Sequence, residues 1–157
     1  MIFATVGTQL PFPRLIQALD AIAGRHAIEI IAQSAHIISG ASYLKQYGSL
    51  PPEEFDGLAA RSNMIVAHAG TGSVLSAAQH GKPIILFPRI AALGEHRNEH
   101  QLATAQMFRS RRGIYVATDV DELESLILRD DLVPFVRDQD SESAPLIHAV
   151  SDFIKAS

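Results

Sequence analysis

Short runs of apolar residues alternate along the chain with segments in which apolar residues recur every three or four positions. Continuous apolar runs are typical of buried strands, and the periodic segments are typical of amphipathic helices. The alternation predicts an α/β fold, a single Rossmann-like doubly wound parallel sheet with helices on both faces. The predicted strands are 2–6, 27–33, 64–68, 83–88 and 113–117. The predicted helices are 11–23, 51–61, 73–80, 98–110, 120–129 and 145–156.

The chain is long enough for one domain. Its 157 residues, of which 47% are hydrophobic and 19% charged, can bury a substantial core and exclude a disordered chain. We therefore expect one domain over 1–157, in which a polar link over 137–144 leads to the last helix.

Composition and charge narrow the classes of function. The net charge of −4 gives no sign of a basic surface, so we expect no nucleic-acid partner. The absence of cysteine excludes disulfides and thiolate metal ligands. The N-terminus lacks the pattern of a signal peptide, and no apolar run approaches the roughly 18 residues of a membrane span. We expect a cytoplasmic protein, which a partner can still recruit to a membrane.

Small residues follow two of the predicted strands, at the edge of the sheet where such folds bind ligands. Small residues let backbone N–H groups approach an anion, which the positive end of a helix also favours. One interpretation is a phosphate-binding site, and the other is a pair of tight turns without a ligand. The spacing matches neither a Walker loop nor a dinucleotide fingerprint. The residues are Gly7, Thr8, Gly70, Thr71, Gly72 and Ser73.

A second polar cluster, GEHRNEHQLATA, occupies 94–105. Within it, His96, Glu99 and His100 form the pattern His-x-x-Glu-His of inverted zinc proteases. A zinc hydrolase would need a third ligand and a helix that runs through 96–100, so that both imidazoles share one face. The alternative is a solvated start of a helix, which Gly94 favours.

These segments resemble a known family. The run HAGTGSVLSAAQHGKPIILFP, the later EHQLATA and the start ATVGTQLPF are similar to the donor-binding half of family 28 GT-B glycosyltransferases. The resemblance covers residues 1 to about 130. It is closest to the small catalytic subunits of two-part transferases that act on lipid-linked sugars, in particular those of bacterial exopolysaccharide assembly.

The resemblance implies a site for a UDP-sugar. The two glycine loops would bind the donor phosphates, and Ser49 and Leu50 would contact the uracil. Ser76 stands where many relatives have a Glu that binds the ribose hydroxyls, so either Ser76 or Glu95 would bind the ribose. His68 is the candidate catalytic base, and the candidate cations near the phosphates are Arg89 and Arg97. The residues expected near the donor sugar are Glu95, Glu99, His100 and Gln101.

The family also implies the reaction. The chain would be the catalytic, UDP-sugar-binding subunit of an inverting glycosyltransferase that transfers a glucuronosyl or N-acetylglucosaminyl group, without a metal or other cofactor. Because a complete GT-B enzyme has two such domains, a membrane-associated partner would bind the polyprenyl-diphosphate-linked acceptor. Two alternatives stay open: the zinc hydrolase, and a non-catalytic subunit that senses UDP-sugar.

Overall fold

The computed structural model describes residues 1–137. The predicted helix 145–156, and the predicted link 137–144 beyond its first residue, lie outside the described residues. The extent of the domain, 1–157, therefore stays a prediction. No helix among the described residues is long and apolar enough to cross a membrane.

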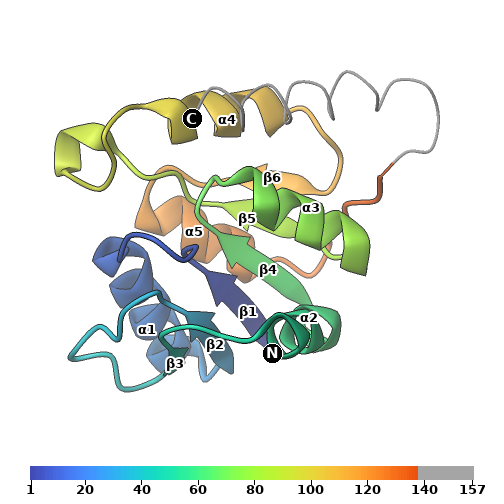
Figure 1. Cartoon of the computed structure of the whole chain (residues 1–157). Helices are drawn as coiled ribbons and strands as arrows, with labels where there is room; N and C mark the ends of the chain where they lie inside the picture. Colours follow the sequence, from blue (N-terminus) through green and yellow to red (C-terminus); the bar gives the residue numbers. More distant parts are fainter. Residues whose placement is uncertain (138–157) are drawn as a thin grey trace.

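The described residues form a six-stranded parallel sheet in the order β3-β2-β1-β4-β5-β6 (Figure 1). This is the strand order of a doubly wound, Rossmann-type sheet, so the predicted fold is confirmed. The strands are β1 (Ile2–Thr5), β2 (Ile30–Gln33), β3 (Lys45–Tyr47), β4 (Met64–Ala67), β5 (Ile84–Leu86) and β6 (Ile114–Val116). The helices are α1 (Pro13–His26), α2 (Pro52–Arg61), α3 (Thr71–His80), the short 3₁₀ helix η1 (Ala91–Leu93), α4 (His100–Phe108) and α5 (Val120–Ile127).

The sequence predicted five of these strands and missed β3. This strand has the sequence Lys-Gln-Tyr, lies at the edge of the sheet and is exposed or half-buried. An edge strand needs no continuous apolar run, and charged residues there are common. The prediction for 27–33 was too long at its start, because α1 continues to His26 and ends in the left-handed residue Ala27.

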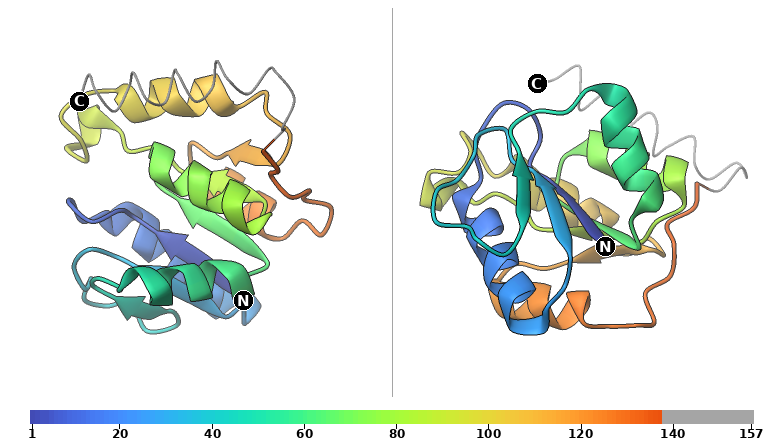
Figure 2. Two further views of the ribbon diagram at one scale, coloured as in Figure 1. Left: turned by 45° about the vertical axis from the view of Figure 1, so that its right-hand side comes forward. Right: turned by 90° about the horizontal axis from the view of Figure 1, so that it is seen from below.

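Helices cover both faces of the sheet (Figure 2). Successive strand residues point to opposite faces, so Ala4 packs into the core under α1 and α5, whereas Phe3 packs into the core under α2, α3 and α4. The two cores enclose β1 and β4, whose side chains are all buried.

The chain reverses direction across the sheet between β1 and β4. From β1 it passes outward to β2 and β3, and then returns to β4 and continues to β5 and β6. Thr5 and Ala67, the last residues of the two central strands, are register partners. Ligands of open α/β sheets bind at this switch point, beyond the carboxyl ends of the strands.

Candidate functional site

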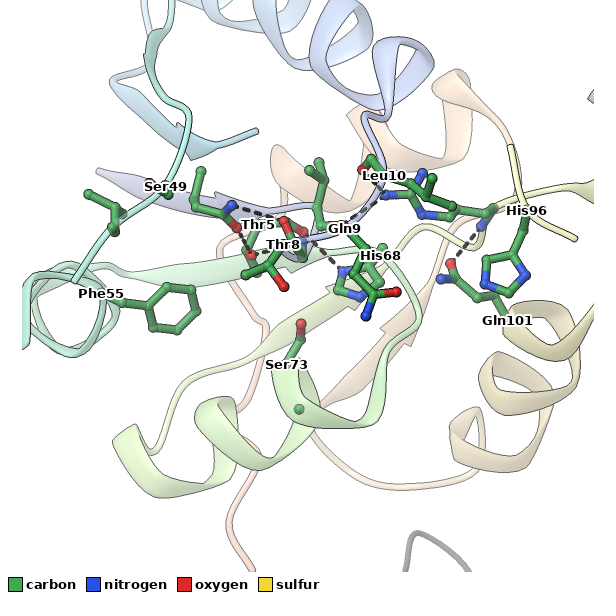
Figure 3. A pocket seen from close by; sticks show the side chains of 16 residues that line it. Thr5, Thr8, Gln9, Leu10, Ser49, Phe55, His68, Ser73, His96 and Gln101 are labelled. Atoms are coloured by element: carbon green, nitrogen blue, oxygen red, sulfur yellow. Dashed lines mark hydrogen bonds between the residues drawn. The ribbon is translucent and has the colours of Figure 1, made fainter. Parts of the chain in front are cut away.

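A cavity of about 430 Å³ lies at this switch point. It extends from Ser49 and Phe55 at one end, past Thr8 and Ser73, to His96 and Gln101 at the other end (Figure 3). The cavity is within the range of about 300–1,000 Å³ that is typical of small-molecule sites. Its walls are formed by Thr5, Val6, Gly7, Thr8, Gln9, Leu10, Gln33, Ser49, Leu50, Phe55, His68, Gly72, Ser73, Arg89, His96 and Gln101.

Two of the predicted glycines are required by the packing of His68. A Cβ atom on Gly70 would overlap Nε2 of the His68 ring, and a Cβ atom on Gly7 would lie 3.1 Å from the same ring. Gly7 also has a φ of +81°, in the region that favours glycine. The imidazole therefore lies between the two glycine loops and connects them.

Burial lowers the pKa of His68 to about 4, and the nearby charges of Arg89 and His96 lower it as well. Its Nδ1 lies 3.4 Å from the carbonyl oxygen of Thr5, a contact that opposes this shift and favours the tautomer with the proton on Nδ1. The ring is neutral at pH 7. A general base works best with a pKa near the operating pH, so the structure favours a positioning role for His68, and its catalytic role stays a prediction.

The turn at 70–73 begins α3. Its N-cap residue, Gly70, has no side chain that could accept a hydrogen bond from the first N–H groups of the helix. Gly72 and Ser73 line the cavity. A Cβ atom on Gly72 would meet nothing within 4 Å, so packing does not require this glycine. An exposed helix start with a small residue facing a cavity suits the approach of a phosphate.

Gln33 is a site residue that the sequence analysis missed. Its buried amide accepts a hydrogen bond from Oγ1 of Thr5 (2.7 Å) and donates to the carbonyls of Gly7 (2.9 Å) and Gly48 (3.1 Å). It thereby joins the first glycine loop to the segment that contains Ser49. A polar residue at the carboxyl end of a buried strand is the signal that could have revealed it.

Arg89 places a buried positive charge beside the cavity. Its guanidinium donates to four backbone carbonyls, those of Val6 (2.9 Å), Leu10 (2.7 Å), Pro11 (2.7 Å) and Glu95 (3.4 Å). Burial lowers its pKa, but a guanidinium remains protonated in proteins. Within residues 1–137 the guanidinium bonds carbonyls and no carboxylate, so its charge favours an anion in the cavity while its bonds shape the loop 6–11.

Of the four residues expected near the donor sugar, Gln101 is the one that lines the cavity. Its side chain is buried and its Oε1 accepts a hydrogen bond from the backbone N–H of Arg89 (3.0 Å). His100, the first residue of α4, is exposed and does not line this cavity.

The two glutamates do not line the cavity. The carboxylate of Glu95 forms a two-bond ion pair with Arg14 (2.7 and 3.0 Å) and accepts from the N–H of Ile90 (2.9 Å). Glu99 is exposed and accepts from the N–H of Ala91. Ser76 lies one turn after Ser73 on α3, outside the cavity walls. Its Oγ is buried without a hydrogen-bond partner in the described part of the chain.

The geometry that the zinc motif needs is not present. Helix α4 begins at His100, so His96 lies before it and the two imidazoles do not share a helical face. Among residues 1–137, no three His, Asp or Glu side chains gather as they would around a metal ion. Residues 96–100 therefore do not form the helix that the zinc-hydrolase alternative requires.

Comparison with family models decides the family. The model of the glycosyltransferase family 28 C-terminal domain matches residues 1–144. The chain belongs to this family. It is thus a glycosyltransferase domain, as the resemblance predicted. A search of curated proteins by sequence found no significant match.

Solved structures show the same fold at low sequence identity. ALG13, solved by NMR, has a TM-score of 0.63 and 16% identity over 95% of this chain and 94% of its own. CalG4, the calicheamicin glycosyltransferase, has a TM-score of 0.60 and 15% identity over 79% of this chain. MurG of Acinetobacter baumannii has a TM-score of 0.59 and 16% identity over 83% of this chain. The chain spans only 32% of CalG4 and 42% of MurG, and it matches half of a GT-B fold.

Proposed function

We propose that this family 28 domain binds a UDP-sugar and is the catalytic subunit of a two-component inverting glycosyltransferase. The observation that supports this most strongly is the order of groups along the cavity at the switch point (Figure 3). Ser49, Leu50 and Phe55 suit a uracil at one end. Gly72 and Ser73, at the start of α3, suit the diphosphate in the middle. Gln101 suits the sugar at the other end.

Stabilisation of the departing UDP is the chemistry that the cavity supports best. In direct displacement at the anomeric carbon, negative charge develops on the diphosphate as the bond to the sugar breaks. In this proposal, the N–H groups at the start of α3 and the buried charge of Arg89 would stabilise that charge, which is supported by the presence of Gly72, Ser73 and Arg89 in the cavity wall. In this proposal the protein needs no metal or other cofactor, and the base that accepts the proton of the acceptor hydroxyl is His68 or a group of the partner.

The proposal assigns the acceptor to a second polypeptide. The chain corresponds to about a third of CalG4, whereas it spans almost the whole of ALG13. In this respect it resembles a small subunit. We propose a membrane-associated partner at the cytoplasmic face of the membrane, which binds a polyprenyl-diphosphate-linked acceptor for exopolysaccharide or glycan assembly. Glucuronosyl and N-acetylglucosaminyl groups are the two transfers proposed.

One observation favours a second candidate. Ser76 has a single hydroxyl, which cannot accept hydrogen bonds from both ribose hydroxyls as a carboxylate can, and Glu95 is paired with Arg14. A non-catalytic subunit that senses UDP-sugar would tolerate this weaker contact. In this candidate, the donor site would regulate the partner.

Transfer measured with and without the partner tests the proposal. Membranes from cells that co-express the chain and its partner should transfer sugar from UDP-glucuronic acid or UDP-N-acetylglucosamine to lipid. The purified chain alone should not. Transfer that persists when Gln101 is replaced by Ala would favour the sensing subunit, and robust transfer by the purified chain would refute the two-component proposal.

A further inference from the structure

A second cavity, of about 890 Å³, adjoins the first. It lies between the first turns of α1, the loop over 93–97 and the start of α5. Leu10 and His96 line both cavities, and His96 lies at the end of the first cavity that is remote from Ser49 (Figure 3). The second cavity therefore meets the donor site at the end proposed for the sugar.

The charged side chains of the second cavity favour an anion. Its lining includes two guanidiniums, those of Arg14 and Arg97, and one carboxylate, that of Glu95. Glu95 already accepts two hydrogen bonds from Arg14 and one from the N–H of Ile90. Arg97 is exposed, and within residues 1–137 no carboxylate forms an ion pair with it. Among its described lining residues, the cavity thus has one more guanidinium than carboxylate.

Two exposed leucines form an apolar wall beside these charges. Leu93 is 60% exposed and Leu10 is 43% exposed, and both line the second cavity together with Pro11 and Pro13. An apolar wall next to the unpaired guanidinium of Arg97 is suited to an amphiphilic anion, with its phosphate at Arg97 and its hydrocarbon portion on the leucines.

We propose that the second cavity binds the diphosphate and the adjoining lipid of the acceptor, so that this chain contributes to acceptor recognition itself. The inference rests on the proposed function, since it assumes that a UDP-sugar occupies the first cavity. The acceptor hydroxyl would then approach the donor sugar at His96 and Leu10, where the cavities meet. The partner would complete the acceptor site rather than supply all of it.

Farnesyl diphosphate and inorganic diphosphate are suitable probes, because they share the anion and differ in the lipid. Binding is measured by calorimetry on the purified full chain, with UDP present at saturation. We expect farnesyl diphosphate to bind while UDP remains bound, and inorganic diphosphate to bind at least several-fold more weakly. Arg97→Glu should weaken farnesyl diphosphate roughly tenfold or more, as expected for loss of a charge-assisted hydrogen bond.

Two further variants make the test specific. Leu93→Ser should weaken farnesyl diphosphate and leave inorganic diphosphate unchanged, whereas Arg112→Glu, at an exposed arginine outside both cavities, should change neither. The inference is wrong if farnesyl diphosphate displaces UDP, if Arg97→Glu has no effect, or if inorganic diphosphate binds equally well. Failure to bind UDP at all would refute the proposed function, whereas normal UDP binding without farnesyl diphosphate binding would refute only this inference.

Discussion

Nε2 of His68 occupies the space into which a Cβ atom on Gly70 would project. The ring also lies against Gly7 of the first loop, so one imidazole leaves little room for a side chain in either loop. Gly7 and Gly70 are therefore required by the packing of the His68 ring. Gly72, which has open space around it, is the glycine left for a ligand.

This difference predicts opposite outcomes for two alanine variants. Gly70→Ala forces the backbone away from His68 and should lower the free energy of unfolding by about 1–3 kcal/mol. Gly72→Ala, in a helix, should leave stability unchanged or raise it by up to about 1 kcal/mol, because alanine favours helix. It should nevertheless weaken UDP binding, because Gly72 lines the cavity at the position proposed for the diphosphate. Urea denaturation and calorimetry measure the two effects.

The double variant His68→Ala/Gly70→Ala is the control for the proposed clash. If the steric explanation holds, the double variant loses less stability than the sum of the two single variants. Additive losses would show that Gly70 is needed for another reason.

The lowered pKa of His68 predicts a stability that depends on pH. In the unfolded chain this histidine binds a proton near its ordinary pKa of 6.5, but in the folded chain only near 4. The unfolded state therefore gains the proton first, and stability falls as the pH decreases through this window. From about pH 7 to about pH 5 the loss should be about 2 kcal/mol. Urea denaturation at both pH values measures it.

The contribution of His68 to the pH dependence of stability must be distinguished from the contributions of the other titrating groups. His68→Gln should remove this part of the pH dependence, whereas His26→Gln, at the surface, should leave it in place. An unchanged pH dependence in His68→Gln would show that His68 ionises equally easily in both states.

The hydrogen bonds of Gln33 predict that a change at the end of β2 alters both the stability of the protein and its affinity for UDP. Gln33→Leu leaves the carbonyls of Gly7 and Gly48 and the hydroxyl of Thr5 without their partner, so both stability and UDP affinity should fall. The stability loss should be about 1–3 kcal/mol. Gln46→Leu is the matched control, because Gln46 likewise makes two backbone bonds, to Ile38, outside the cavity. It should reduce stability but not UDP affinity; equal losses of affinity would refute a specific role for Gln33.

Gln101 can be tested with its structural bond kept. Gln101→Glu retains an oxygen that can accept from the N–H of Arg89, removes the amide N–H groups and adds a carboxylate at the cavity. If the amide donates to the donor sugar in the transition state, transfer should fall at least about 10²-fold. The assay is transfer in membranes that contain the partner. Full activity in Gln101→Glu would exclude the amide as a donor to the sugar.

The sequence was sufficient for the fold because the central strands are buried on both faces and are therefore continuous apolar runs. It was insufficient for β3, whose Lys-Gln-Tyr sequence is stabilised by pairing with β2 and by no apolar pattern of its own.

Within the site, the glycine loops could be predicted from the sequence, because the need for small residues in a turn depends on the local backbone. The partners of Gln33 and Glu95 were not. Gln33 bonds residues 26 and 15 positions away, and Glu95 pairs with Arg14 across 81 positions, which removes this acid from the donor cavity. Such contacts depend on the packed sheet, so residue type and spacing alone cannot assign them.

The most direct measurement of the central claim is an NMR titration of the ¹⁵N-labelled chain with UDP. We predict saturable binding, with the largest chemical-shift changes at Gly7 and Thr8, at Ser49 and Leu50, and over 70–73. We also predict weaker binding of UMP, which lacks the second phosphate, and of GDP, which has a larger base. Shifts confined to other surfaces, or stronger binding of GDP than of UDP, would contradict a UDP-sugar site at this switch point.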